Sequence, residues 1–213
     1  MSEEFDIEKH VTIQNIVGSG KLPVEIDTEV LGDALEDMSE DESYTWMDDG
    51  PQPGLYYEIN GDEGPQVTFH ESGSYIVRAD NEEQLHETNE RVIEELASLG
   101  VIEEVLDNEA LDFSIQNVVA LAKLNRDIKL RALYSGLKTV GGDEEDEGTD
   151  AQYEPEVFPA LEYSTPKYPC SFLVYGNGKI IIAGASSVDE VKDAMRDFYD
   201  EIDDVYFSIV DMR

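Results

Sequence analysis

The sequence has a single cysteine, Cys170, among its 213 residues. One cysteine excludes an intramolecular disulfide and a zinc site built from a cysteine cluster. The three histidines, His10, His70 and His86, lack the i, i+4 spacing typical of helical metal ligands. We therefore expect a protein without a bound metal and without a cofactor.

Long apolar runs are also missing. No stretch approaches the ~20 apolar residues that a membrane-spanning helix requires. The acidic start, MSEEFDIEK, does not resemble a secretory signal. These features predict a soluble, cytoplasmic protein with no membrane partner.

Basic residues are scarce, because 14 Lys and Arg side chains stand against 50 Asp and Glu, a net charge of −36. Two interpretations compete. Such a charge repels nucleic acid, whose phosphates normally require a basic surface. It is also typical of adaptation to very high salt, where repulsion is screened within ~3 Å at 1 M. The acids are spread through every segment, which favours salt adaptation.

Catalytic motifs are absent as well. The stretch GSGK (18–21) lacks the first glycine and the Ser or Thr of a phosphate-binding loop, and no helix is predicted to start there. Carboxylate pairs occur everywhere and therefore indicate no particular site. We expect neither an enzyme nor a protein with a small-molecule substrate.

An internal repeat is present instead. VTIQNIVGSG (11–20) matches FSIQNVVALA (113–122), with the shared IQN motifs 102 residues apart. PGLYY (53–57) likewise matches PALEY (159–163), and SGSYIVRA (72–79) matches NGKIIIAG (177–184). Two copies without a third exclude a solenoid. The pattern predicts a tandem duplication with repeats at 1–107 and 108–213.

Each repeat reads as a strand, a helix, several strands and a long helix. IQN-containing segments are β-branched, YGNGK (175–179) is a hairpin signal, and residues 81–99 and 186–202 are amphipathic. A first helix over 26–38, with Asp27 as N-cap candidate, is predicted to place Val30, Leu31, Ala34, Leu35 and Met38 on one apolar face, with 128–137 as its counterpart. Segment 141–150 is low-complexity and acidic, and we expect a disordered loop there. The expected fold is α+β, a curved antiparallel sheet with helices on one face and the other face open.

The motifs YEPEVFPALEY (153–163) and FLVYGNGKIIIAGASSVDEV (172–191) resemble the TATA-box-binding protein family. The resemblance covers residues ~10–204 in two copies in the right order. It implies a pseudo-twofold saddle whose concave sheet enters the minor groove of A·T-rich double-stranded DNA and wedges apolar side chains between base steps.

The resemblance also implies roles for individual residues. Asn15 and Asn117 match the pair that donates to base-edge acceptors, since an amide can donate to adenine N3 and thymine O2. Val17, Val119 and Ile181 match apolar positions of the concave face. Phe158 and Tyr175 match the wedge pair of the second repeat, and Lys179 matches a phosphate contact. The residues that match the contact with transcription factor B are Glu154, Glu156 and Val157.

The first repeat departs from the family pattern. Gln52 and His70 stand at its two wedge positions, although Phe69 could replace His70 after a register shift. Ser74 replaces the phosphate-contacting lysine. Arg78, and Ala183 in the second repeat, stand where threonines of the family read bases. Glu58, and Ser164 in the second repeat, replace arginines of the family pattern. Residues 1–107 carry 4 basic and 29 acidic side chains, against 10 and 21 in residues 108–213. We therefore expect any phosphate affinity to be polarised toward the second repeat.

Two functions remain open on this basis. In the first, the protein is a general transcription initiation factor that binds and bends A·T-rich promoter DNA and recruits transcription factor B, with a weakened first repeat. In the second, the fold survives without specific DNA reading, and the protein is an interaction or regulatory module.

Overall fold

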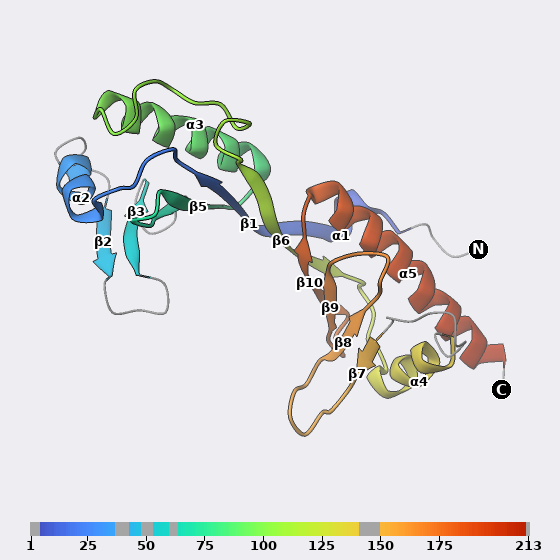
Figure 1. Cartoon of the computed structure of the whole chain (residues 1–213). Helices are drawn as coiled ribbons and strands as arrows, with labels where there is room; N and C mark the ends of the chain where they lie inside the picture. The colour runs from blue at the N-terminus through green and yellow to red at the C-terminus, as the bar shows by residue number, and fades with distance from the viewer. Residues whose placement is uncertain (1–4, 37–42, 48–52, 60–63, 141–149, 212–213) are drawn as a thin grey trace. The chain divides into compact units, whose positions relative to one another are not determined.

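The computed structural model describes residues 5–36, 43–47, 53–59, 64–140 and 150–211 (Figure 1). They form two compact units. The first-repeat unit contains Asn15–Gln116. The second-repeat unit contains Met1–Gln14 together with Asn117–Arg213.

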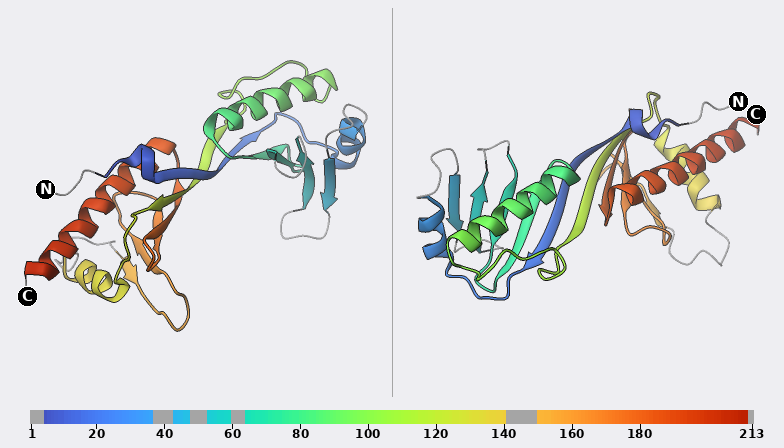
Figure 2. Two further views of the ribbon diagram at one scale, coloured as in Figure 1. Left: turned by 180° about the vertical axis from the view of Figure 1, so that it is seen from behind. Right: turned by 90° about the horizontal axis from the view of Figure 1, so that it is seen from above.

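The first-repeat unit has an antiparallel sheet with helices packed on it. Across the sheet the strands are β2 (Ser43–Met47), β3 (Gly54–Glu58), β4 (Gln66–Phe69), β5 (Ser74–Ala79) and β1 (Val11–Lys21), of which residues 15–21 lie in this unit. The helices are α2 (Thr28–Glu36) and α3 (Glu82–Ser98). Figure 2 shows α3 lying across one side of these strands.

The second-repeat unit follows the same plan. Its strands are β6 (Ser114–Lys123), of which residues 117–123 lie in this unit, then β10 (Lys179–Ala185), β9 (Ser171–Val174), β8 (Leu161–Ser164) and β7 (Asp150–Gln152), in that order. The helices are α4 (Leu130–Val140) and α5 (Val188–Asp211), preceded in sequence by the short α1 (Ile7–His10). The predicted strand–helix–strands–helix order is thus confirmed in both repeats within the described residues.

Side chains alternate between a covered and an open side of each sheet. In β6, Val118, Ala120 and Ala122 are buried, whereas Val119 and Leu121 between them are partly exposed. The buried positions face the helices, and α3 and α5 present apolar stripes that include Leu85 and Phe198. Each unit therefore has an open face, which consists of the half-exposed alternate strand residues.

Paired contacts show that the two units are structural repeats. Tyr57 Oη donates to Glu95 Oε2 at 3.2 Å, and Tyr163 Oη donates to Glu201 Oε2 at 2.6 Å, with the same separation of 38 residues. The β4–β5 and β9–β10 hairpins use Gly73 and Gly178 at φ 82° and 80°. A positive φ favours glycine in such turns, which explains why this residue recurs there.

One prediction for the first helix is wrong. Val30 is 63% exposed on α2, while Leu31 and Leu35 are buried. Asp27, the N-cap candidate, accepts from Val30 N–H at 3.1 Å. The buried stripe of the helix consists of Thr28, Leu31, Gly32 and Leu35, so Val30 lies on the solvent side of it. Met38 and nearly all of segment 141–150 fall outside the described residues.

The leading segment of each repeat packs with the other repeat's unit. Phe5 stacks on Tyr199 of α5, with ring centroids 4.4 Å apart. Phe113 stacks on Tyr75 of β5 at 6.0 Å. The boundary of the duplication between residues 107 and 108 remains a prediction. The compact units divide the chain differently, because residues 1–14 pack with the second repeat and residues 108–116 pack with the first.

Candidate nucleic-acid interface

The open face of the second-repeat unit is a half-exposed apolar surface between two central strands. In the antiparallel pairing of β10 with β6, Ile181 lies opposite Leu121, and Ala183 lies opposite Val119. Directly opposed residues of an antiparallel pair point to the same side of a sheet. Ile181 and Val119, both predicted site residues, are therefore brought together on one face.

Asn117 is oriented on this unit by its neighbour strand. Gly184 N–H donates to Asn117 Oδ1 at 2.8 Å, at the point where the register of β10 shifts between Ala183 and Ala185. Because a backbone N–H can only donate, the amide oxygen is identified and the Asn117 Nδ2 group keeps both its protons for other acceptors. Asn15, by contrast, makes no side-chain hydrogen bond with any described residue.

Sequence reasoning did not identify Gly184 as part of this site. It adopts φ 103°, and a Cβ there would lie 3.1 Å from the Pro169 carbonyl oxygen. A glycine in the interior of a predicted strand, as in IIIAGAS, is the signal for a bulge that could have found it.

The connection between β7 and β8 carries Phe158, whose aromatic partner Tyr175 lies in the turn between β9 and β10. Figure 1 shows this connection extending away from the strands. Phe158 is 36% exposed, and its ring meets the Tyr175 ring edge-to-face at a centroid distance of 6.5 Å. Val157 beside it is 79% exposed. Because the two exposed side chains are consecutive, they present contiguous apolar area on this connection rather than isolated positions.

The carboxylates predicted to contact a protein partner lie in the same connection. Glu154 and Glu156 are exposed, and the Glu154 carbonyl accepts from the N–H groups of Val157 and Phe158, both at 2.9 Å. This turn holds Val157 outward beside the two acids. The structure thus brings together all the second-repeat residues of this predicted contact.

The open face of the first-repeat unit carries a chain of hydrogen-bonded, long polar side chains, whereas the equivalent positions of the second repeat hold the small residues Ala183, Ser171 and Ser164. Arg78 Nη1 donates to Gln66 Oε1 at 2.8 Å, and Gln66 Nε2 donates to Glu58 Oε1 at 3.2 Å. Arg78 lies opposite Val17 on the neighbouring strand. The link joins residues from three strands, which no spacing in the sequence indicates.

The first-repeat wedge position is occupied by His70. His70 N–H donates to the Ser74 carbonyl, as Tyr175 N–H donates to the Lys179 carbonyl, so the two residues are structural equivalents. Phe69 is 1% exposed and belongs to the core, so the suggested register shift does not occur. The His70 ring nitrogen Nδ1 lies 2.9 Å from the Pro53 carbonyl oxygen. Gln52 lies outside the described residues.

Ionisable groups with shifted pKa values lie away from both open faces. Burial, reinforced by Glu95, raises the pKa of Tyr57, and burial raises that of Tyr75. Burial raises the pKa of the Cys170 thiol to about 11. Hydrogen bonds from Lys167 and Tyr168 lower the pKa of Asp197. Each of these shifts moves the pKa of the group further from pH 7, whereas acid–base catalysis requires a pKa near the working pH.

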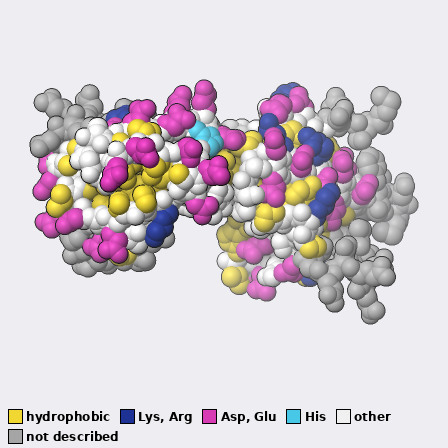
Figure 3. All heavy atoms as spheres, turned by 45° about the horizontal axis from the view of Figure 1, so that its top comes forward, with side chains coloured by type: hydrophobic (Ala, Val, Ile, Leu, Met, Phe, Trp, Pro, Cys, Tyr) yellow, Lys and Arg dark blue, Asp and Glu magenta, His cyan; other side chains and the backbone are white. Residues whose placement is uncertain are grey.

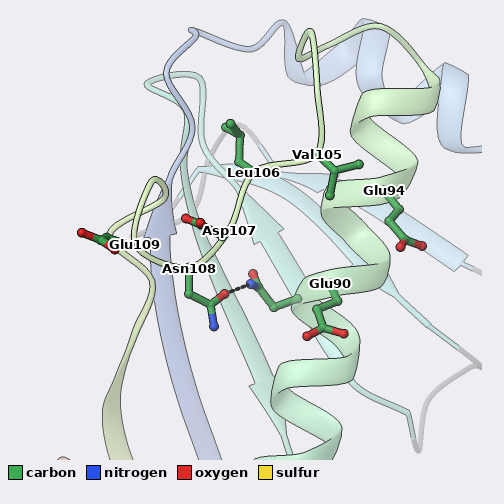
Figure 4. A pocket seen from close by; sticks show the side chains of 8 residues that line it. Glu90, Glu94, Val105, Leu106, Asp107, Asn108 and Glu109 are labelled. Atoms are coloured by element: carbon green, nitrogen blue, oxygen red, sulfur yellow. Dashed lines mark hydrogen bonds between the residues drawn. The ribbon is translucent and has the colours of Figure 1, made fainter.

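The remaining polar clusters do not form a metal site. Within the described ranges, no three His, Cys, Asp or Glu side chains are arranged to hold an ion. Figure 4 shows an acidic cavity of about 540 Å³, where Glu90 and Glu94 of α3 face the segment that carries Asp107 and Glu109. Asn89 Nδ2 donates to Asn108 Oδ1 across it at 2.9 Å.

Among the described helices, none combines the length and hydropathy needed to cross a bilayer.

Comparisons with known proteins identify the family. Residues 112–205 match the family model for transcription factor TFIID, or TATA-binding protein. TATA-box-binding protein C of Halobacterium salinarum is 38% identical over 197 residues, 92% of this chain and 98% of the relative. TATA-box-binding protein 2 of Haloferax volcanii is 29% identical, with 91% and 93% covered.

A solved structure shows the same fold. The TATA-binding protein of Methanococcus jannaschii superposes with a TM-score of 0.64 at 27% identity, over 92% of this chain and 99% of that one. The match confirms the predicted α+β class with tandem repeats. The relatives are transcription factors rather than enzymes. The chain belongs to the TATA-box-binding protein family.

Proposed function

We propose that this protein is a general transcription factor that binds the minor groove of A·T-rich promoter DNA, bends it, and recruits transcription factor B. Its wedge is provided mainly by the second repeat. The observation that carries this proposal is the exposed Phe158 ring, edge-to-face with Tyr175, on the unit whose open face includes the apolar Val119 and Ile181.

The second-repeat unit has the chemistry that minor-groove binding requires. The two free protons of the Asn117 amide match the acceptors that A·T pairs present in the minor groove. Val119 and Ile181 supply apolar contact beside it. Insertion of Phe158 would unstack a base step at a cost of a few kcal/mol, which wrapped contacts must offset.

Transcription factor B would bind the β7–β8 connection. Val157 supplies exposed apolar area at the tip, and Glu154 and Glu156 supply charge for basic residues of the partner. Charges at the rim of an interface chiefly affect specificity and association rate, so Val157 should contribute more of the affinity than either acid.

The first repeat supports a second candidate function, that of a protein-interaction module without specific DNA reading. Its open face carries the Arg78–Gln66–Glu58 chain, and the Glu58 carboxylate is unfavourable beside phosphates. The wedge equivalent there is a histidine held by a backbone carbonyl.

The proposal is tested by measuring how the protein binds and bends an A·T-rich duplex in molar KCl. Fluorescence resonance energy transfer between dyes at the two ends of the duplex reports the bending. We expect F158A to lose most of the bending and at least tenfold in affinity. The matched control is V105A, which truncates an apolar side chain 58% exposed on the acidic cavity. If the unaltered protein binds no A·T-rich duplex between 0.5 and 3 M KCl, the interaction-module function replaces the proposal.

A further inference from the structure

Two lysines face each other across the central strands of the second-repeat unit. Lys179 on β10 lies directly opposite Lys123 on β6, on the same side as Ile181 and Leu121. Like charges in directly opposed strand positions destabilise a sheet. The chain has only eight lysines, so a repulsive pair on the open face calls for a reason.

The positive charge continues beyond this pair. A cavity of about 470 Å³ adjoins it, lined by Lys9, His10, Thr12, Gln14, Leu121, Lys123 and Asn125. No carboxylate lines this cavity, in a chain with 50 of them. Neither Lys9 nor Lys123 forms an ion pair with any residue that the structure describes.

Contacts among Asn125, His10 and Phe5 hold the lining of the cavity in place. Asn125 Nδ2 lies 3.3 Å from His10 Nδ1, and the His10 ring stacks on Phe5 at 5.3 Å. Lys9 lies in α1, whose N-cap Asp6 accepts from Lys9 N–H at 3.3 Å. The N-terminal segment therefore places a further cation beside Lys123.

The equivalent place in the first-repeat unit provides an internal comparison. Lys21, the counterpart of Lys123, lies opposite Ser74 rather than a second lysine. The cavity beside it, about 580 Å³, is lined by Glu25 and Asp112 as well as Lys21. Only the second-repeat position therefore combines paired lysines with a wall free of carboxylates.

We propose that Lys9, Lys123 and Lys179 bind successive phosphate groups, with Lys123 and Lys9 as contacts that the family motif does not include. The expected ligand is a series of linked phosphate groups, and under the proposed function these are the phosphates of the DNA backbone. The proposal rests on that function for its source of phosphate, whereas the geometry alone defines the site. Phosphate neutralises the Lys123–Lys179 repulsion, which explains why a chain with so few cations retains the pair.

The salt dependence of duplex binding tests the site through K123Q. Each phosphate contact contributes about 0.9 to the slope of log affinity against log salt concentration. We expect the K123Q slope to differ from that of the unaltered protein by about one, so the affinity ratio between them changes about threefold from 0.5 to 2 M KCl. K21Q, the matched control, should leave the slope unchanged. K123Q should melt no lower than the unaltered protein, because the exposed repulsion is removed.

Titration with inorganic pyrophosphate, measured by calorimetry, separates the two sources of phosphate. We expect saturable binding that K123Q and K9Q abolish and K21Q retains. If the duplex binds and both slopes and pyrophosphate binding are unaffected by K123Q, the lysine site is wrong and the proposed function stands. If no duplex binds but pyrophosphate binding depends on Lys123, the site stands as a free-phosphate site and the proposed function fails. Absence of both kinds of binding overturns both.

Discussion

At the scale of single residues, the two repeats differ in how they fill equivalent places in the core. Tyr75 of the first repeat stands where the second has Ile180, and its Oη donates to the buried Asn89 Oδ1 at 2.8 Å. The strand beside Tyr75 carries Gly20, and the strand beside Ile180 carries Ala122. The larger ring is thus accommodated by the smaller neighbour.

We predict that G20A destabilises the protein by roughly 1–3 kcal/mol, as overpacking of a core does. A Cβ at residue 20 would lie 2.5 Å from Tyr75 Oη and 2.6 Å from Cζ, in a ring that is fully buried and hydrogen-bonded. Urea denaturation at constant KCl measures the change in free energy of unfolding.

A double-mutant cycle with Y75I provides the control. Ile and Ala occupy the equivalent positions in the second repeat, so G20A should cost far less in the Y75I background. Equal costs in both backgrounds would show that the clash with the Tyr75 ring is not the cause.

At the scale of elements, the N-terminal segment acts as part of the second-repeat unit. Ile7 of α1 is buried, Phe5 lies nearly parallel to Tyr199, and Glu8 pairs with Lys192 of α5 at 2.7 Å. The aromatic contact removes apolar area from water, whereas the ion pair joins side chains that are 76% and 31% exposed. Exposed pairs contribute little to stability.

We therefore predict that F5A lowers the free energy of unfolding by about 1–2 kcal/mol. E8Q should change it by less than about 0.5 kcal/mol, because its pair is exposed. Both are measured by urea denaturation at 2 M KCl. A larger effect of E8Q than of F5A would show that charge, rather than ring stacking, attaches α1 to α5.

At the scale of the whole molecule, charge is the dominant feature. Figure 3 shows carboxylates scattered across the described surface in view rather than gathered in one patch. Self-repulsion at a net charge of −36 destabilises the compact state when salt does not screen it.

We predict that the melting temperature rises by at least 10 °C between 0.1 and 2 M KCl, because the Debye length falls from about 10 Å toward 3 Å or less. Differential scanning calorimetry measures it. The control is the same salt series near pH 4, close to the sequence pI of about 4.1, where the gain should shrink. A melting temperature that is flat or falls at neutral pH would exclude salt adaptation as the reason for the acidic surface.

The sequence alone determined the duplication, the order of elements and the candidate site of the second repeat. Short-range features carry these: IQN motifs, the turn glycines Gly73 and Gly178, and the aromatic pair Phe158 and Tyr175. Each of these features depends on the local backbone preference of a residue or on a motif of neighbouring residues in the sequence.

Tertiary structure decided the rest, because strand register places residues far apart in sequence side by side. Only pairing shows that Lys123 faces Lys179 and that Arg78 reaches Glu58 through Gln66. Packing also decides between Phe69 and His70, which the sequence left open, because Phe69 is buried and His70 is the structural equivalent of Tyr175. A one-residue difference in register exchanges the two faces of a strand, and long-range pairing energies select between them.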